Sequence, residues 1–81
     1  MQERKIMLST VQDAKEFVTI AGTCDFDIDV TVGKNIMVDA KSIIGVLSLD
    51  LKNAVSVHYD GNNKAFEQFV ERHEAMAHSA A

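Results

Sequence analysis

Apolar side chains recur along this chain with two different periods. Between residues 25 and 32, apolar and polar residues alternate strictly, which predicts a strand with one buried face. Between Val11 and Thr23, apolar residues instead recur every three or four positions, which predicts a helix that ends at Gly22. The chain therefore combines strands and helices within a short length.

The same two periods continue through the rest of the sequence. They predict, in order, strand 5–9, helix 11–23, strand 25–32, strand 36–38, helix 42–49, strand 55–60 and a helix from residue 64. This β-α-β-β-α-β-α order predicts an α+β domain, in which a four-stranded antiparallel sheet carries helices on one face and leaves the other face open. The phenylalanines are expected in its core, at Phe17, Phe26, Phe66 and Phe69.

Length and charge narrow the possible functions. The 81 residues predict a single domain, residues 1–81, with residues 78–81 as a frayed tail. Eight Lys and Arg against twelve Asp and Glu give a net charge of −4 without a basic cluster. We therefore expect that the chain binds neither nucleic acid nor an acidic membrane surface. No apolar run reaches the ~18–20 residues of a membrane span, and no signal-peptide segment is visible. We therefore expect a cytoplasmic protein.

Two segments of the chain carry a pattern that is similar to a known family. Residues 41–49, Lys-Ser-Ile-Ile-Gly-Val-Leu-Ser-Leu, resemble the regulatory-serine segment of HPr, the histidine phosphocarrier of the bacterial sugar phosphotransferase system. Residues 55–61, Val-Ser-Val-His-Tyr-Asp-Gly, resemble the last strand and turn of that family. The resemblance covers residues 5–76 and implies the HPr-like open-faced β-sandwich, with the same order of elements.

The segment that carries the phosphoryl group in this family is missing. HPr proteins use the histidine of a Gly-x-His-x-Arg-Pro segment between the first strand and the first helix. Here that junction, residues 9–14, reads Ser-Thr-Val-Gln-Asp-Ala, is several residues shorter, and lies in a chain without proline. The chemistry needs an imidazole nucleophile, with helix amides and an arginine to steady the phosphate. We therefore expect a non-catalytic member of the family, which is no enzyme and uses no cofactor.

Ser42 is the remaining candidate for phosphate chemistry. The resemblance places it where HPr kinase phosphorylates a serine, before a helix whose N-terminus favours negative charge. The resemblance also implies that Ile43 and Leu47 contact a protein partner, which would be HPr kinase or a transcription regulator. The resemblance therefore implies a phosphoprotein of bacterial sugar transport regulation. The alternative is that Ser42 is only a helix cap and that Ile43 and Leu47 belong to the core.

The other polar groups suggest weaker alternatives. His58 and Asp60 lie two residues apart on the last predicted strand and are expected on its open face. A phosphoryl carrier that uses His58 or Thr10 is an alternative function. No third ligand accompanies His58 and Asp60, and the aspartates of residues 25–29 lack the glycine and glutamate of a calcium loop. We therefore expect no metal site.

The remaining residues of interest are interpreted as structural. Cys24 closes the first helix and is expected to pack in the core, while His73 and His78 are expected to face solvent. Met7 and Met37 lie on the outer sides of their predicted strands and would form an apolar patch if those strands were neighbours. Such a patch, or strand pairing along an exposed edge of the sheet, would make the protein a self-associating homo-oligomer.

Overall fold

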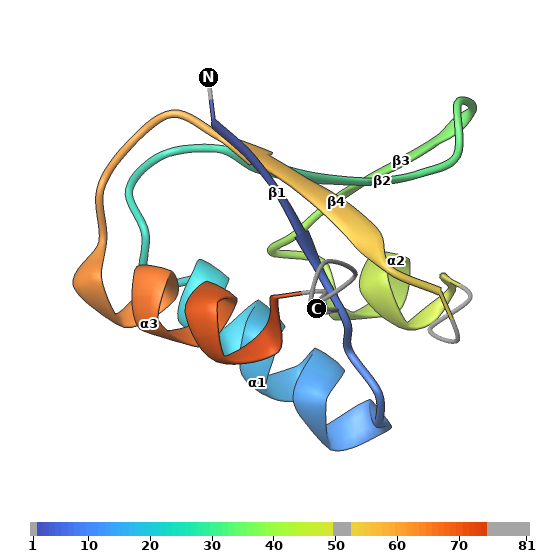
Figure 1. Cartoon of the computed structure of the whole chain (residues 1–81), viewed down its shortest axis with the longest axis horizontal. Helices are drawn as coiled ribbons and strands as arrows, with labels where there is room; N and C mark the ends of the chain where they lie inside the picture. The colour runs from blue at the N-terminus through green and yellow to red at the C-terminus, as the bar shows by residue number, and fades with distance from the viewer. Residues whose placement is uncertain (1, 50–52, 75–81) are drawn as a thin grey trace, which may run out of the picture.

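The computed structural model describes residues 2–49 and 53–74, which form a four-stranded sheet with helices on one face (Figure 1). The strands are β1 (Gln2–Ile6), β2 (Ile28–Val32), β3 (Ile36–Asp39) and β4 (Val55–Tyr59). The helices are α1 (Val11–Ala21), α2 (Ile43–Leu47) and α3 (Lys64–His73). This arrangement confirms the predicted α+β class and the β-α-β-β-α-β-α order. No helix among these residues is long and apolar enough to cross a bilayer.

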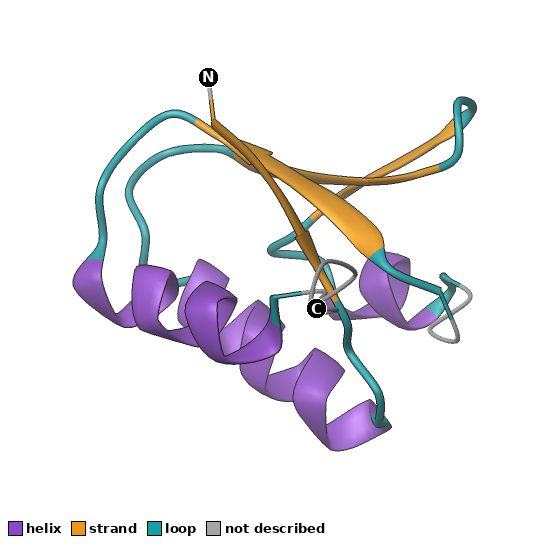
Figure 2. Ribbon diagram, in the orientation of Figure 1, coloured by secondary structure: helices purple, strands orange, loops and turns teal. Residues whose placement is uncertain are grey.

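The sheet is antiparallel throughout and has the strand order β1-β4-β2-β3 (Figure 2). Val57 of β4 lies opposite Arg4 of β1 on one side and Val30 of β2 on the other, and Val30 lies opposite Val38 of β3. This cross-strand row points toward the helices. The neighbouring row, which includes His58, points to the open face because side chains alternate along a strand.

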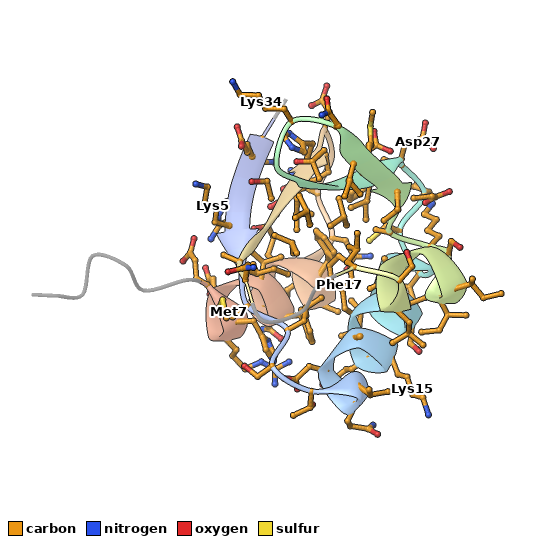
Figure 3. The ribbon with its side chains drawn as sticks, turned by 90° about the vertical axis from the view of Figure 1, so that its right-hand side faces the viewer. Lys5, Met7, Lys15, Phe17, Asp27 and Lys34 are labelled. Carbon is orange, nitrogen blue, oxygen red and sulfur yellow. The ribbon has the colours of Figure 1, made fainter. Side chains whose placement is uncertain are left out.

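The core fills the layer between the sheet and the helices. Val55, Val57 and Tyr59, every second residue of β4, are at most 1% exposed. Phe17 of α1 lies in the middle of this layer (Figure 3), with its ring 5.9 Å from that of Phe66. The apolar face of β4 and the apolar face of α1 therefore belong to the same core, as the sequence predicts.

Each helix begins at a side chain that satisfies a free backbone amide. The side-chain oxygens of Thr10, Ser42 and Asn63 accept a hydrogen bond from the N–H three residues further on, at 3.0, 3.2 and 3.0 Å. Such caps stabilise a helix start by about 1 kcal/mol each. Gly22 follows the last residue of α1, which confirms the predicted end of that helix.

Two strands begin at residues other than the predicted ones. β1 covers residues 2–6 instead of 5–9. It begins earlier because its polar residues pair with β4. It ends earlier because the chain leaves β4 after Ile6, and the N–H of Met7 donates to the carbonyl of His73 at 2.8 Å. β2 begins at Ile28 instead of residue 25. The ring of Phe26 lies outside the ladder, half-buried, and stacks on Tyr59 with centroids 6.1 Å apart.

The predicted methionine patch is wrong. β1 and β3 lie at opposite edges of the sheet, with β4 and β2 between them. Met7 follows β1 and is half-buried, whereas Met37 lies in β3 and is 65% exposed. The sequence could not show this separation, because the strand order depends on long-range pairing.

Candidate functional site

The N-terminus of α1, where the family places its histidine, has a different surface here. Thr10 caps the helix, and its hydroxyl accepts the N–H of Asp13. The carboxylate of Asp13 turns back and accepts the backbone N–H of Ser9 at 3.2 Å. Val11, the first residue of the helix, is 55% exposed. This helix end therefore presents an apolar side chain and a carboxylate, and no imidazole lies in residues 9–14.

Ser42 lies at the exposed N-terminus of α2. Its Oγ is 3.2 Å from the N–H of Gly45, and its carbonyl accepts the N–H of Val46 at 3.0 Å. A Cβ at Gly45 would lie 3.3 Å from this Oγ and 3.3 Å from Val38, so the glycine lets the start of α2 sit close against β3. The predicted cap is confirmed. The hydroxyl remains on the surface, where a second protein can reach it.

The residues around Ser42 form an apolar surface on α2. Ile43 is 37% exposed and Leu47 is 38% exposed, so neither belongs to the fully buried core. Ile44, which the sequence analysis did not single out, is 80% exposed. Its exposure could have been inferred from Val46, which is fully buried, because residues two apart lie on roughly opposite sides of a helix. We call Ile43, Ile44 and Leu47 the α2 surface.

The α2 surface and the start of α1 lie on one side of the molecule. The two helices pack against each other. Figure 3 views the molecule from this side, with α2 and the N-terminal half of α1 turned toward the viewer and Lys15 of α1 pointing outward. The start of α1 and the helix α2 therefore share one side of the molecule, although they are distant in sequence.

His58 lies on the open face of the sheet, where its hydrogen-bond partner is Thr31 and not Asp60. His58 is half-buried in β4, and its Nε2 lies 2.9 Å from the hydroxyl of Thr31 on β2. In the sheet register His58 stands between Glu3 and Asp29 on the open face. Asp60 follows the end of β4 and is exposed. His58 therefore has a structural partner across the strands, which residue spacing along one strand could not reveal.

Cys24 and His73 both contribute to packing. Cys24 is 5% exposed, as predicted, and burial raises the pKa of its thiol. His73 was expected to face solvent, but its ring stacks on Phe69 at 4.0 Å and its Nδ1 lies 2.9 Å from the carbonyl of that residue. Its Nε2 lies 3.7 Å from a carboxylate oxygen of Asp13. The expectation for His73 is wrong because the end of α3 packs beside α1; His78 lies outside the described residues.

A half-buried network of polar side chains, which could not be predicted from the sequence, joins β1, β4 and α3. Arg4 lies 3.1 Å from Glu67 and 2.8 Å from Glu74, and the hydroxyl of Tyr59 donates to the second oxygen of Glu67 at 2.7 Å. The hydrogen bond to Glu74 raises the pKa of Arg4. Burial, followed by the hydrogen bond to Glu67, raises the pKa of Tyr59 to about 12. This network ties the first strand to the last helix.

The ionisation of Tyr59 tests this network. Its pKa is expected to be about 12 in the folded chain, against 10.0 for an unperturbed tyrosine. Because the folded pKa is raised, the stabilisation by the neutral phenol is complete below about pH 10 and is lost as the pH rises from about 10 to about 12. The substitution Glu67→Gln is expected to lower this pKa, since it removes the negative charge beside the phenol. The absorbance of tyrosinate during a pH titration reports this group alone, because the chain has one tyrosine.

Glu71→Gln is the matched control for the titration. Glu71 is an exposed carboxylate on the same helix. Its replacement is expected to leave the pKa of Tyr59 unchanged. An unperturbed pKa in the natural chain, or an equal effect of both substitutions, would contradict the proposed role of Glu67.

The described residues contain no enclosed site for a small molecule. No pocket is present in residues 2–49 and 53–74. The same ranges hold no group of three or more histidine, cysteine or acidic side chains that could bind a metal ion. Within this part of the chain, the features suited to interaction are therefore surfaces, above all the α2 surface with Ser42 at its start.

Comparison with known proteins identifies the family. A family model described as the PTS HPr component phosphorylation site matches residues 10–77. The structure is similar to HPr-C-His from Thermoanaerobacter tengcongensis, with a TM-score of 0.71 and 29% identity, over 88% of this chain and 92% of that chain. It also shares the fold of the phosphocarrier protein HPr from Bacillus anthracis str. Ames, with a TM-score of 0.67 and 21% identity, over 90% of this chain and 96% of that chain. A search of curated proteins gave no match. Since the family model spans most of the sequence, the chain belongs to the HPr family of the phosphotransferase system.

Proposed function

We propose that this chain is a non-catalytic regulatory or interaction module of the HPr family, controlled by phosphorylation of Ser42. The observation that carries the proposal is the combination of an exposed serine at the start of α2 with a junction before α1, residues 9–14, that contains no histidine. The family supplies the context, a cytoplasmic bacterial protein of sugar transport regulation. The site supplies the candidate residue.

The N-terminus of α1 is unsuited to phosphoryl transfer. The free amides of a helix N-terminus favour an anion, and in this family they face the phosphate. Here the carboxylate of Asp13 already accepts the N–H of Ser9, and Val11 occupies the exposed first position. A phosphate placed at this point would meet the carboxylate of Asp13, and residues 9–14 supply neither an imidazole to carry it nor an arginine to neutralise it. The imidazole of His73, whose Nε2 lies 3.7 Å from Asp13, comes from α3 and is stacked on Phe69. This supports the absence of carrier activity.

The start of α2 is better suited to receive a phosphate. Ser42 Oγ already lies 3.2 Å from the N–H of Gly45, and no acidic residue occupies the first turn of this helix. A phosphate on this oxygen would add about −1.5 to −2 charges beside the exposed backbone amides at this point. The neighbouring apolar surface would then carry a strong negative charge at its border.

The α2 surface is the proposed contact for the protein partner. Ile43, Ile44 and Leu47 expose apolar side chains next to Ser42, which is the pattern expected for a small interaction site. The partner is HPr kinase or a transcription regulator, as the family resemblance implies. Phosphorylation of Ser42 would change its affinity, because the phosphate lies at the edge of the contact.

Phosphorylation by HPr kinase and ATP is the direct test. We expect the chain to gain the mass of one phosphoryl group, and we expect Ser42→Ala to abolish this gain. The Ser42→Ala variant also loses the cap of α2, at a cost of about 1 kcal/mol, so its folding is verified by circular dichroism. Ser48→Ala is the matched control, since Ser48 is an exposed serine at the other end of the same helix. The Ser48→Ala variant is expected to gain the same phosphoryl mass as the natural chain.

Incubation with phosphoenolpyruvate and enzyme I tests the alternative of a phosphoryl carrier. We expect no mass gain. Acid-labile phosphate on His58 or on another histidine would contradict the non-catalytic assignment and favour a carrier that uses a non-standard residue. The hydrogen bond of His58 to Thr31 and its position between Glu3 and Asp29 in the register disfavour that result, since two carboxylates would face the phosphate.

A further inference from the structure

The two edges of the sheet differ in how they are protected. β1, at one edge, is polar along residues 2–5 and is closed at its end by a bridge between Ile6 and Glu74. β3, at the other edge, has no partner among the described residues on its outer side. Ile36 and Met37 in this strand are 51% and 65% exposed. Natural proteins usually block an edge with charges or a cover, so an apolar, uncovered edge strand is suited to pair with another chain.

The hydrogen bonds of β3 show which of its peptide groups face outward. The N–H of Ala40 donates to the carbonyl of Ile28 on β2 at 2.9 Å. In an antiparallel ladder the direction of the peptide groups alternates, so the even-numbered residues of β3 bond to β2. The N–H and carbonyl groups of Met37 and Asp39 therefore point to the free side of the strand.

The hairpin of β2 and β3 also leaves apolar surface uncovered on its inner face. Figure 1 shows this hairpin projecting beyond the helices, and Figure 3 shows Lys34 at its tip pointing into solvent. Ile36 lies on the same side of the sheet as Val38, which packs against the core near α2. No helix among the described residues extends under Ile36, which explains its exposure on a face that is buried elsewhere.

We propose that the outer edge of β3 pairs with β3 of a second copy of this chain, antiparallel and with Met37 opposite Met37. This register uses the outward peptide groups of Met37 and places Asn35 opposite Asp39 of the other copy. It also brings Ile36 beside Val38 of the second copy on the inner face. The two molecules then share one eight-stranded sheet around a twofold axis.

Two features of the strand favour a second copy as the occupant of this edge. Lys34 precedes β3 and Asp39 ends it, so antiparallel pairing brings the positively charged end of each strand to the negatively charged end of the other, with the two side chains on opposite faces of the sheet. Parallel pairing would place like charges together. The uncovered Ile36 of each copy also meets the part of the other copy where α2 underlies the sheet. The strand is therefore complementary to itself in both charge and apolar surface.

Sedimentation velocity over a concentration series tests the pairing. Because the strand is short, we expect a weak dimer, with a dissociation constant between about 10 μM and about 1 mM. Met37→Lys is expected to weaken it by at least about tenfold, since two ammonium groups would face each other across the twofold axis. Val11→Lys, which places the same charge on an exposed apolar position of α1, is expected to dimerise like the natural chain.

Cross-linking tests the register. In the proposed pair the Cα atoms of the two Met37 residues lie about 5.5 Å apart, within the range of a disulfide. Oxidation of Met37→Cys is therefore expected to give a covalent dimer. Asn35→Cys is expected to give none, because its two copies would be separated by about four residues along the strands. The native Cys24 is buried, and the unsubstituted chain provides the blank.

Three other results would contradict the proposal. A natural chain that stays monomeric up to about 1 mM has no such pairing, and its edge then fits a strand of a different protein. A dimer that survives Met37→Lys, but is lost in Ile44→Lys, associates through the α2 surface. A covalent dimer from Asn35→Cys with none from Met37→Cys excludes the register. Circular dichroism of each variant shows that the monomer is folded, which separates loss of pairing from loss of structure.

Discussion

Replacing Phe66 with alanine is expected to lower the free energy of unfolding by about 3–5 kcal/mol. Phe66 is fully buried on α3, and its ring lies 5.9 Å from that of Phe17 and 5.0 Å, edge to face, from that of Tyr59. Alanine leaves a cavity at the point where two helices and the sheet meet. For a domain of this size the loss is a large part of the total stability, so the variant is expected to be partly unfolded at 37 °C. Urea unfolding followed by circular dichroism measures it.

Gln68→Ala is the control for this cavity. Gln68 is exposed on the same helix, and alanine is a good helix former, so the change is expected to stay within about 0.5 kcal/mol of the natural chain. A loss below about 1.5 kcal/mol for Phe66→Ala would mean that the neighbouring rings close the cavity, contrary to the packing described above.

Gly61→Ala is expected to destabilise the chain by about 1–3 kcal/mol. A Cβ at this position would lie 2.3 Å from the nearest carbon of the Phe26 ring, too close for any real contact. Gly61 does not have a positive φ, so the cost arises from the close approach of the ring and not from backbone conformation. Phe26 stacks on Tyr59, and its displacement would disturb the end of the core. Thermal unfolding measures the loss.

Gly22→Ala is the matched control for Gly61→Ala. Gly22 has φ −65°, and the nearest atoms to an added Cβ lie at 3.4 Å, an ordinary contact. Its replacement is expected to be neutral or to stabilise the chain by about 0.4–1 kcal/mol, because alanine restricts the unfolded state. Combining Gly61→Ala with Phe26→Ala is expected to cost less than the sum of the two single changes, since the smaller side chain removes the clash. Additive losses would show that the clash is not the cause.

The positions of the secondary-structure elements were largely predictable from the sequence. The strict alternation before Val32 and in residues 55–59 identified two central strands, because one face of each is buried and the other is not. Ser42 was predictable as a cap, since a serine before an apolar helix satisfies a backbone amide. The absence of a histidine from residues 9–14 was likewise visible without a structure.

The local sequence could not show contacts between distant residues. Arg4 and Glu67 are 63 residues apart, and only the packing of α3 against β1 brings them within 3.1 Å. His73 has a polar sequence environment, yet its Nε2 lies 3.7 Å from Asp13 at the start of α1, sixty residues earlier in the chain. Ile44 shows the reverse case, an apolar residue that is exposed, because the short helix α2 turns it away from the core. In each case the neighbour across the fold decided the environment of the side chain.

By itself the sequence determined the fold class, the ends of most elements, the family and the absence of a histidine from residues 9–14, because these depend on patterns of neighbouring residues. The tertiary structure decided which side chains share a surface. It placed α2 and the start of α1 on one side of the molecule, and it separated Met7 from Met37 by two strands. Within the described residues it also left the outer edge of β3 unpaired, whereas Glu74 after α3 bridges to Ile6 of β1. The physical reason is that strand order and helix packing minimise exposed apolar surface over the whole chain, which no local pattern encodes.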